Sequence, residues 1–434
     1  MTATAGRLEF RRIRAIACLR SRNADIVGLA IGGSAVTVSR RNLLAGAAGS
    51  AVLPRLAKAQ GGKPIRIGVL ADMNGPYADF SGQGAAVAGR LAAEEFGGGT
   101  AVEILSADHQ NKPDIAVSIA RGWIDTQGVD AVVECSTSGS ALALQALMRE
   151  KERILLITVA GSSDITGKFC SPFGFNFNCD TYALAHTAGQ ALTRTGGDSW
   201  FFITVDYAFG HALERDASRF VTESGGKVLG SVTHPLGTAD FSSYLIAAQA
   251  SGAKVVAFCN AGADAQNAIK QAAEFGLSRG GQRLTALLLF VTDVLAIGLP
   301  SAQGLVLANS FYWDLNDATR AWTKRFRAQK DRLPSMNQAG VYAAVRHYVR
   351  AVQAGGRDAK AAAAAMRALP VNDMFNQDVR VREDGRVLSK LYLMEVKMPA
   401  ASRSADDVYA ILGTTPGEQA FRPLAESKCP LVRK

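Results

Sequence analysis

The sequence predicts an α/β fold made of two doubly wound parallel-sheet lobes. Apolar runs of five or six residues alternate with helical patterns, as in layered βαβ units. These runs are apolar throughout, which is typical of strands covered by helices on both faces. About 375 residues lie beyond residue 59 of the 434, more than one hydrophobic core usually holds. Two lobes of similar construction are therefore expected.

The predicted elements fall into two series and a mixed last quarter. The first series has the strands "IRIGVL", "AVEILSAD", "VDAVVE" and "ILLITV", with helices at 85–96, 114–126 and 140–150. The second has a helix at 181–195, the strands "WFFITV", "KVLGSVT", "KVVAFC" and "LTALLLF", and helices at 212–222, 241–250 and 263–275. From about residue 304 come the strand "LVLAN", helices at 317–330, 338–354 and 358–369, and short strands "VRVRE" and "LYLMEV". These remaining elements indicate that the chain crosses between the lobes more than once.

The segment "SRRNLLAGAAGSAVLPRLAKAQ" at 39–60 has the three zones of an export signal. Arg40 and Arg41 begin it, an Ala/Gly-rich apolar run follows, and small residues precede a cleavage point near Ala59-Gln60. The paired arginines favour the twin-arginine route. A membrane helix is disfavoured, because the run is shorter than the roughly 20 residues a span needs and contains glycines, a serine and a proline. We expect residues 1–59 to be an N-terminal extension plus signal peptide, and the rest to be periplasmic.

The basic character of the chain is confined to this segment. The net charge is +10, but residues 1–59 hold ten Lys and Arg against Glu9 and Asp25. The remainder is close to neutral and shows no basic patch interleaved with aromatic residues. A nucleic-acid partner is therefore not expected.

Five cysteines lie beyond residue 59, and their spacing does not suggest a metal site. No CxxC pair, HxxxH or HExxH spacing occurs, so neither zinc nor another cofactor is expected. Cys135 and Cys259 lie at the ends of apolar strands and are expected to be buried thiols. An oxidising compartment permits a bridge from Cys170 to either Cys179 or Cys429.

Two enzyme hypotheses fail on spacing. The glycines of "SGQGAAVAG" at 81–89 resemble a dinucleotide fingerprint, with Asp108 at the next strand end. Eleven residues separate Leu70 from Gly82, however, whereas that motif needs its first glycine directly after the strand. No GxSxG elbow is present either. The chain is therefore expected not to be an enzyme.

Short hydroxyl residues follow two neighbouring strands, in "ECSTSGS" and "TVAGSSD". Ligands of open parallel sheets bind beyond the carboxyl ends of the strands, where helix N-termini carry partial positive charge. Two such turns are suited to one carboxylate, since the Gly-rich cradle and lysine of a phosphate loop are missing. The alternative is that Ser138 and Ser162 only cap helices.

At these turns the chain resembles the leucine/isoleucine/valine-binding protein family of periplasmic ABC-transporter receptors. The resemblance covers roughly residues 63–400 and rests on "IRIGVLADMNGPYADFSGQGAAVAGRLAAEEFGG", "DHQNKPDIAVSIARGWID", "GVDAVVECSTSGSALALQ", "DYAFG" and "DFSSYLIAAQASGAKVVAFCNAGADAQNAIKQAAEFG". It implies two lobes of the type I periplasmic-binding-protein fold, joined by a three-segment hinge and closing on ligand. The expected N-terminal lobe comprises residues 63–179 and 309–372, and the C-terminal lobe 180–308 and 373–434.

The resemblance also implies binding residues in the first lobe. The ligand-carboxylate serine falls on Ser138, and the turn that adds backbone and hydroxyl donors falls on Ala160 and Ser162. The aromatic of the first loop falls on Phe80, and two neighbours are grouped with it, Asn74 and Tyr77.

The match is less complete in the second lobe. The family's amino-acid receptors hold the ligand ammonium with an aromatic that corresponds here to Gly262, near Asp264, and with an acid that corresponds to Asp293. The missing aromatic argues against an α-amino acid ligand. Tyr182 and Tyr207 are expected instead to line a roomier pocket, as in relatives that take aromatic or other organic acids.

These expectations describe a non-catalytic, monomeric receptor that presents a small carboxylate-bearing solute to an ABC-transporter permease. Closure needs ligand contacts from both lobes. A cytoplasmic ligand-sensing regulator of the same fold is the alternative from another class. The sequence leaves open whether the ligand is an amino acid or an aromatic or other organic acid.

Overall fold

The computed structural model describes residues 63–96 and 99–433. The first of its two sheets has five strands in the order β2-β1-β3-β4-β5, and every pair is parallel. The strands are β1 (Ile65–Ala71), β2 (Val102–Asp108), β3 (Ala131–Glu134), β4 (Ile154–Ile157) and β5 (Gly174–Asn176). We call this sheet and its helices the N-terminal lobe. The predicted signal at 1–59 lies outside the described residues.

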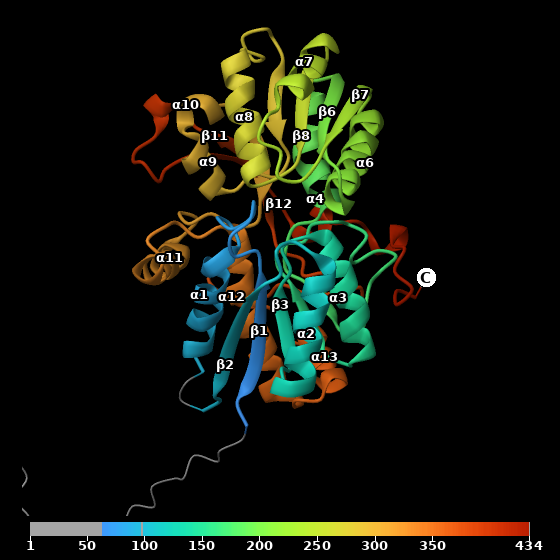
Figure 1. The fold of residues 1–434 in the computed structure, drawn as a ribbon, viewed down its shortest axis with the longest axis vertical. Helices are drawn as coiled ribbons and strands as arrows, with labels where there is room; N and C mark the ends of the chain where they lie inside the picture. Colours follow the sequence, from blue (N-terminus) through green and yellow to red (C-terminus); the bar gives the residue numbers. More distant parts are fainter. Residues whose placement is uncertain (1–62, 97–98, 434) are drawn as a thin grey trace, which may run out of the picture. The chain divides into compact units, whose positions relative to one another are not determined.

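Helices cover both faces of this sheet (Figure 1). They are α1 (Gly82–Glu94), α2 (Pro113–Gln127), α3 (Ser138–Glu150), α12 (Met336–Gly355) and α13 (Ala359–Ala368), and α11 (Asp317–Gln329) packs beside them on α1. Side chains of a strand alternate between faces, so Ile67 and Val69 pack with α1 and α12, whereas Leu70 packs with α2 and α3. This two-sided burial explains why the strand sequences are apolar throughout.

The second sheet has seven strands in the order β12-β11-β10-β9-β8-β6-β7. Its strands are β6 (Ser199–Val205), β7 (Lys227–His234), β8 (Val255–Cys259), β9 (Arg283–Ala286), β10 (Val306–Asn309), β11 (Leu391–Val396) and β12 (Tyr409–Thr415). The pairs β10–β11 and β11–β12 are antiparallel, and the other pairs are parallel. We call this sheet and its helices the C-terminal lobe. The predicted class of two doubly wound, mainly parallel sheets is confirmed.

The remaining helices belong to the C-terminal lobe or to the connections. They are α4 (Thr181–Leu184), the π-helical turn η2 (Ala185–Gly189), α5 (Gln190–Arg194), α6 (Ala208–Glu223), α7 (Ser242–Ala250), α8 (Ala263–Phe275), α9 (Val291–Ile297), α10 (Leu299–Ala302), η3 (Pro399–Ala401), α14 (Gly417–Ala420) and η4 (Leu424–Glu426). Two predicted elements differ from the structure. The apolar run after residue 283 is strand only over β9, and "VRVRE" makes isolated bridges instead of a strand.

The segment before β11 hydrogen-bonds to the edge of the first sheet. Asn176 at the end of β5 donates its N–H to the carbonyl of Gly385 at 2.8 Å, and Val387 donates its N–H to the carbonyl of Asn176 at 3.0 Å. The predicted lobe boundaries stay a prediction. These hydrogen bonds favour moving the last boundary from residue 373 to near residue 389.

A disulfide connects the loop between β4 and β5 to the C-terminal tail. Cys170 and Cys429 are bonded at an S–S distance of 1.96 Å, so the structure selects the second of the two partners that the sequence left open. Cys135, Cys179 and Cys259 are buried free thiols. Because the tail follows β12, the bridge ties the end of the C-terminal lobe's chain to a loop of the N-terminal lobe.

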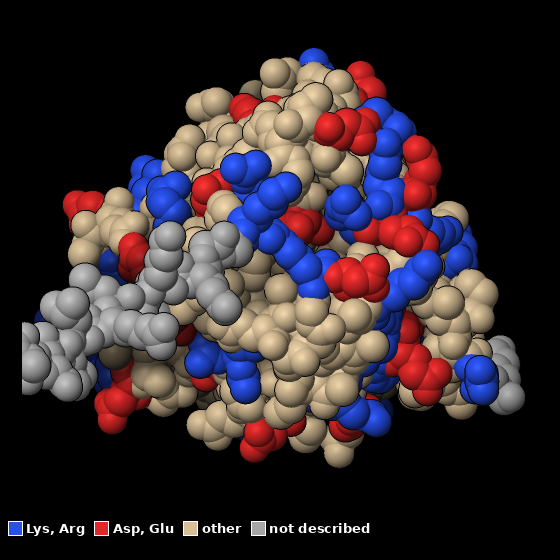
Figure 2. All heavy atoms as spheres, turned by 90° about the horizontal axis from the view of Figure 1, so that it is seen from below, with Lys and Arg blue, Asp and Glu red and all other residues tan. Residues whose placement is uncertain are grey.

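Basic and acidic side chains alternate over the face of the molecule seen in Figure 2. Among residues 63–96 and 99–433, no helix combines the length and apolar character that a membrane crossing requires.

Candidate ligand site between the two lobes

A small cavity lies where strand ends of the two sheets meet. Its volume is about 10 Å³, room for about one water molecule. The lining residues are Tyr77, Phe80, Ser136, Ser138, Val159, Ala160, Gly161, Tyr207, Phe209, Ala261, Leu288 and Phe290. They come from both lobes, so a solute enclosed here contacts both.

The serine turn of the N-terminal lobe provides the polar end of this cavity. Thr137, not Ser138, is the N-cap of α3: its side chain accepts the N–H of Ser140 at 3.2 Å. Ser138 follows it in the first turn, and its Oγ accepts the N–H of Ser162 at 3.1 Å. This arrangement leaves the hydroxyl proton of Ser138 able to bond to a ligand oxygen. The helix-cap interpretation therefore applies to the neighbouring threonine.

A buried glutamate lies beneath this turn, and sequence reasoning missed it. Glu134 ends β3 with φ of +97°, followed by Cys135 at +69°. Its carboxylate accepts hydrogen bonds from Ser81, from Ser136 at 3.1 Å and from Thr158 at 3.3 Å. Burial raises the pKa of Glu134 to about 7, partly offset by these hydrogen bonds. The signal was an acid ending an otherwise apolar strand, and such strained backbone is concentrated at functional sites.

The loop between β1 and α1 places two aromatic rings in the cavity. Asp72 shapes this loop by accepting the N–H of Gly75 at 2.7 Å and of Tyr77 at 2.9 Å. Tyr77 and Phe80 are then almost fully buried. Asn74 behaves differently: it is exposed and donates to Asp108 at 3.2 Å, away from the cavity.

The C-terminal lobe faces these rings with further aromatic side chains. The hydroxyls of Tyr77 and Tyr207 are 2.7 Å apart, and the rings of Phe80 and Phe290 have centroids 4.3 Å apart. Phe209 completes this wall. The structure thus brings Tyr207 together with four of the predicted first-lobe residues and adds the two phenylalanines; the four are Tyr77, Phe80, Ser138 and Ala160. Phe209 lies in "DYAFG", beside the tyrosine that was singled out.

Gly262 is a glycine here because the first loop occupies the space of a side chain. Its φ is +61°, and a Cβ would lie 2.4 Å from the carbonyl oxygen of Pro76 and 3.0 Å from the ring of Phe80. The N–H of Ala263 donates to that same carbonyl at 3.0 Å. The space that a side chain at position 262 would need is therefore filled by the backbone of Pro76 and by the rings of Tyr77 and Phe80.

The two acids considered for a ligand ammonium are engaged elsewhere. Asp264 accepts the N–H of Gly237 with both carboxylate oxygens at 3.1 Å. Asp293 caps α9 by accepting the N–H of Phe290 at 3.0 Å, and it also accepts Gln266 Nε2 at 2.8 Å. Burial raises the pKa of each to about 6. Neither is among the residues that line the cavity.

Tyr182 lies outside the cavity as well. Its ring packs edge-on against Phe220 at 5.0 Å, and the guanidinium of Arg422 lies 4.5 Å from its centroid. Its neighbours Arg219 and Arg422 line a separate, charged pocket.

The site suits reversible enclosure of a small solute. Hydroxyl and amide groups gather at its N-terminal-lobe end, aromatic rings line the rest, and no metal-binding group of three or more His, Cys, Asp or Glu occurs among the described residues. Fold and site together define a two-lobe solute-binding protein.

Comparisons with known proteins indicate the same class of two-lobe binding protein. The model of the periplasmic binding protein family matches residues 64–404, and the chain belongs to this family. A periplasmic binding protein of Burkholderia mallei is 42% identical, with a TM-score of 0.83 over 85% of this chain and 99% of that one. A periplasmic ligand-binding protein of a branched-chain amino acid ABC transporter, from Burkholderia xenovorans, is 39% identical, with a TM-score of 0.77 over 85% and 100% of the chains.

The curated relatives match over less of their length. A Leu/Ile/Val-binding protein homologue of Brucella melitensis is 24% identical over 227 residues, which cover 51% of this chain and 57% of that protein. The chain thus matches little more than half of this relative.

Proposed function

We propose that this protein is the extracytoplasmic receptor of an ABC importer and that it captures a small aromatic carboxylate by closure of its two lobes. The observation that carries this proposal is the division of the cavity into a hydroxyl-lined end and an aromatic-lined end, in reach of both lobes. Family membership supports the class of receptor. The ligand class rests on the side chains of this chain.

The hydroxyl end suits a carboxylate. Ser138 and the backbone around Ala160 and Ser162 converge at the start of α3, where the helix dipole favours negative charge. Ser136 lines the same wall, but its hydroxyl donates to Glu134 and accepts the N–H of Asp72. Several neutral donors that meet in a buried site bind one anionic group without a full counter-charge.

The other end suits an aromatic ring better than an α-ammonium group. Tyr77, Phe80, Tyr207, Phe209 and Phe290 line it, and offset or tilted ring contacts are favourable in such a box. An ammonium needs an acceptor with negative charge, whereas Asp264 and Asp293 are already committed to backbone N–H groups. An amino-acid ligand would require one of them to leave its present partners.

The small cavity volume bears on mechanism. A ring-containing acid does not fit into about 10 Å³, so ligand entry requires the lobes or their aromatic side chains to separate. The Tyr77–Tyr207 hydrogen bond and the Phe80–Phe290 contact join the lobes directly. We infer that ligand replaces part of these contacts and holds the lobes together through its own.

A ligand screen tests the proposed class. The purified protein is titrated calorimetrically with benzoate, 4-hydroxybenzoate, leucine and glutarate. We expect saturable binding of the aromatic acids and weak or undetectable binding of leucine. Tighter binding of leucine than of either aromatic acid would overturn the ligand class while leaving the receptor class intact.

Export is tested separately from binding. Replacing Arg40 and Arg41 together by lysine should leave folded precursor in the cytoplasm, because the twin-arginine route reads the pair as an address. Cell fractionation with an antibody to the protein measures the distribution. Normal periplasmic recovery would instead favour another export route, and a cytoplasmic location of the unaltered protein would favour the sensory alternative.

A further inference from the structure

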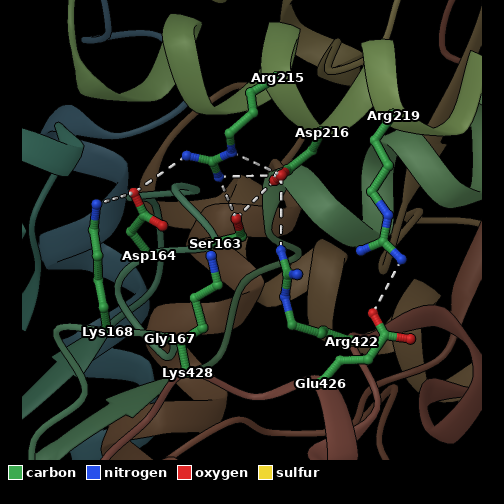
Figure 3. A pocket seen from close by; sticks show the side chains of 10 residues that line it. All are labelled: Ser163, Asp164, Gly167, Lys168, Arg215, Asp216, Arg219, Arg422, Glu426 and Lys428. Carbon is green, nitrogen blue, oxygen red and sulfur yellow. Dashed lines mark hydrogen bonds and ion pairs between the residues drawn. The ribbon is translucent and has the colours of Figure 1, made fainter. Parts of the chain in front are cut away.

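A pocket with more cationic than acidic side chains lies outside the ligand cavity. Its volume is about 500 Å³, and it is lined by the loop between β4 and β5, by α6 and by the C-terminal tail (Figure 3). Five cationic side chains face it, namely Lys168, Arg215, Arg219, Arg422 and Lys428. The disulfide at Cys429 lies next to Lys428 and fixes the tail beside the loop.

The three acids of the pocket are already paired. Asp216 has a side chain only 4% exposed and lies 3.1 Å from a guanidinium nitrogen of Arg215. Asp164 is 3.3 Å from the same guanidinium. Glu426 is 3.1 Å from Arg219. These carboxylates therefore compensate the charge of the α6 arginines.

The two cations of the tail leave the pocket with an excess of positive charge. The guanidinium of Arg422 lies 4.5 Å from the ring centroid of Tyr182 and forms a long ion pair of 3.7 Å with Asp216, which Arg215 also contacts (Figure 3). Lys428 makes no ion pair with any residue that the structure describes, and Figure 3 shows it pointing into the pocket. Because Asp216 is shared by two arginines, five cations and only three acids face one concave space.

We propose that this pocket binds a small dianionic oxyanion, either inorganic phosphate or a short dicarboxylate. Arg422 provides a planar fork of N–H donors and Lys428 a mobile ammonium, the two donor types that bind such anions. The hydroxyl of Ser163, which already donates to Asp216 at 2.7 Å, lies at the same wall. The pocket volume admits either anion together with water.

The location links this pocket to the ligand cavity. Ser162 and Ser163 are consecutive, and the first lies behind the ligand cavity while the second lines the basic pocket. The basic pocket joins a loop of the N-terminal lobe to α6 of the C-terminal lobe.

The test uses the purified protein with inorganic phosphate and with succinate, in separate titrations at constant ionic strength set with sodium chloride. Saturable binding of either anion is expected, and the anion that binds more tightly shows whether the pocket prefers phosphate or a dicarboxylate. Arg422→Gln combined with Lys428→Gln should weaken binding at least tenfold. Lys390→Gln is the matched control, since Lys390 is also exposed and unpaired among the described residues but lies outside the pocket.

Three results would overturn the proposal: no saturable binding of either anion, unchanged affinity in the double variant, or loss of anion binding in Ser138→Ala. The last would place the anion in the ligand cavity. If the double variant does not fold, Lys428→Gln alone decides, because this exposed side chain has no structural partner. It should weaken binding severalfold, and an unchanged affinity would be contrary to the proposal. None of these titrations requires the transported solute.

Discussion

The two lobes contribute different chemistry to the same cavity. The N-terminal lobe provides the hydroxyl of Ser138 and the backbone at Ala160 together with two rings, Tyr77 and Phe80, whereas the C-terminal lobe provides mainly rings and aliphatic groups. The C-terminal lobe does have acids nearby, but these hold its own loops and helices together. The comparison suggests that the N-terminal lobe alone recognises the charge of the solute and that both lobes recognise its shape.

The largest expected effect concerns the covalent link between the lobes. Reducing the Cys170–Cys429 bridge in the chain from residue 60 onward should lower the free energy of unfolding by about 2 to 4 kcal/mol, because the unfolded chain gains freedom. Thermal unfolding with and without reductant measures the loss. Three free thiols are expected under denaturing, non-reducing conditions. A count of five would show that the bridge is absent.

The next effect tests charge recognition by the N-terminal lobe. Ser138→Ala should weaken binding of an aromatic acid roughly ten- to hundredfold, since a charge-assisted hydrogen bond is worth about 1.5 to 3 kcal/mol. Thr137→Ala is the matched control, because it removes the helix cap instead and should cost about 1 kcal/mol of ligand-free stability with affinity nearly kept. Calorimetry and thermal unfolding on both variants separate the two roles. The reverse pattern would show that Ser138 is only structural.

A pH-dependent effect tests the role of Glu134, the buried acid beneath the turn that contains Ser138. Burial raises the pKa of Glu134 from 4.5 to about 7, so the folded chain holds this proton more tightly than the unfolded chain. Its contribution to stability is therefore complete below about pH 4.5 and is lost as the pH rises to about 7. Relative to Glu134→Gln, the unaltered protein should lose on the order of 2 kcal/mol between pH 5 and pH 8. Parallel stability curves for the two proteins would contradict this.

The smallest effect tests whether the C-terminal lobe recognises a charged group of the ligand. Asp293→Asn should leave the affinity for benzoate within about twofold, because the carboxylate caps α9 and does not line the cavity. Ligand-free stability should fall by about 1 kcal/mol at most, since an asparagine oxygen still caps. Titration with benzoate and with leucine checks this. A tenfold loss for leucine would show that the C-terminal lobe reads an ammonium.

Much of the fold was predictable because central strands such as β3, β4 and β8 are buried on both faces and so are mainly apolar. The prediction failed where contacts between residues distant in sequence override the local hydrophobic pattern. The run "LTALLLF" is apolar enough for a long strand, yet Asp293 caps a helix that begins at Val291 and ends the extended segment early. Residues 373–388 gave no sequence sign that they hydrogen-bond to β5.

The candidate site was predictable where position along a strand determines placement. Ser138 and Ala160 follow adjacent parallel strands, so they meet at one sheet edge. Sequence position could not show that Tyr182 packs beneath Arg422 instead of in the cavity. Nor could it show that Asp264 accepts a backbone N–H, or that Asp293 accepts one backbone N–H and the side-chain amide of Gln266. These outcomes depend on partners distant in sequence. The assignment of binding residues stays a prediction until the variants above are measured.

Gly262 has a consequence for how this binding site can change over evolutionary time. A side chain at this position meets the backbone carbonyl of Pro76 first and then the rings of Tyr77 and Phe80, so it is tolerated only if the first loop retreats. The positive φ of Gly262 adds strain for any other residue. The conformation of the loop between β1 and α1 and the residue at position 262 should therefore change together among relatives. A receptor with this loop conformation does not accept an aromatic at 262 through one substitution alone.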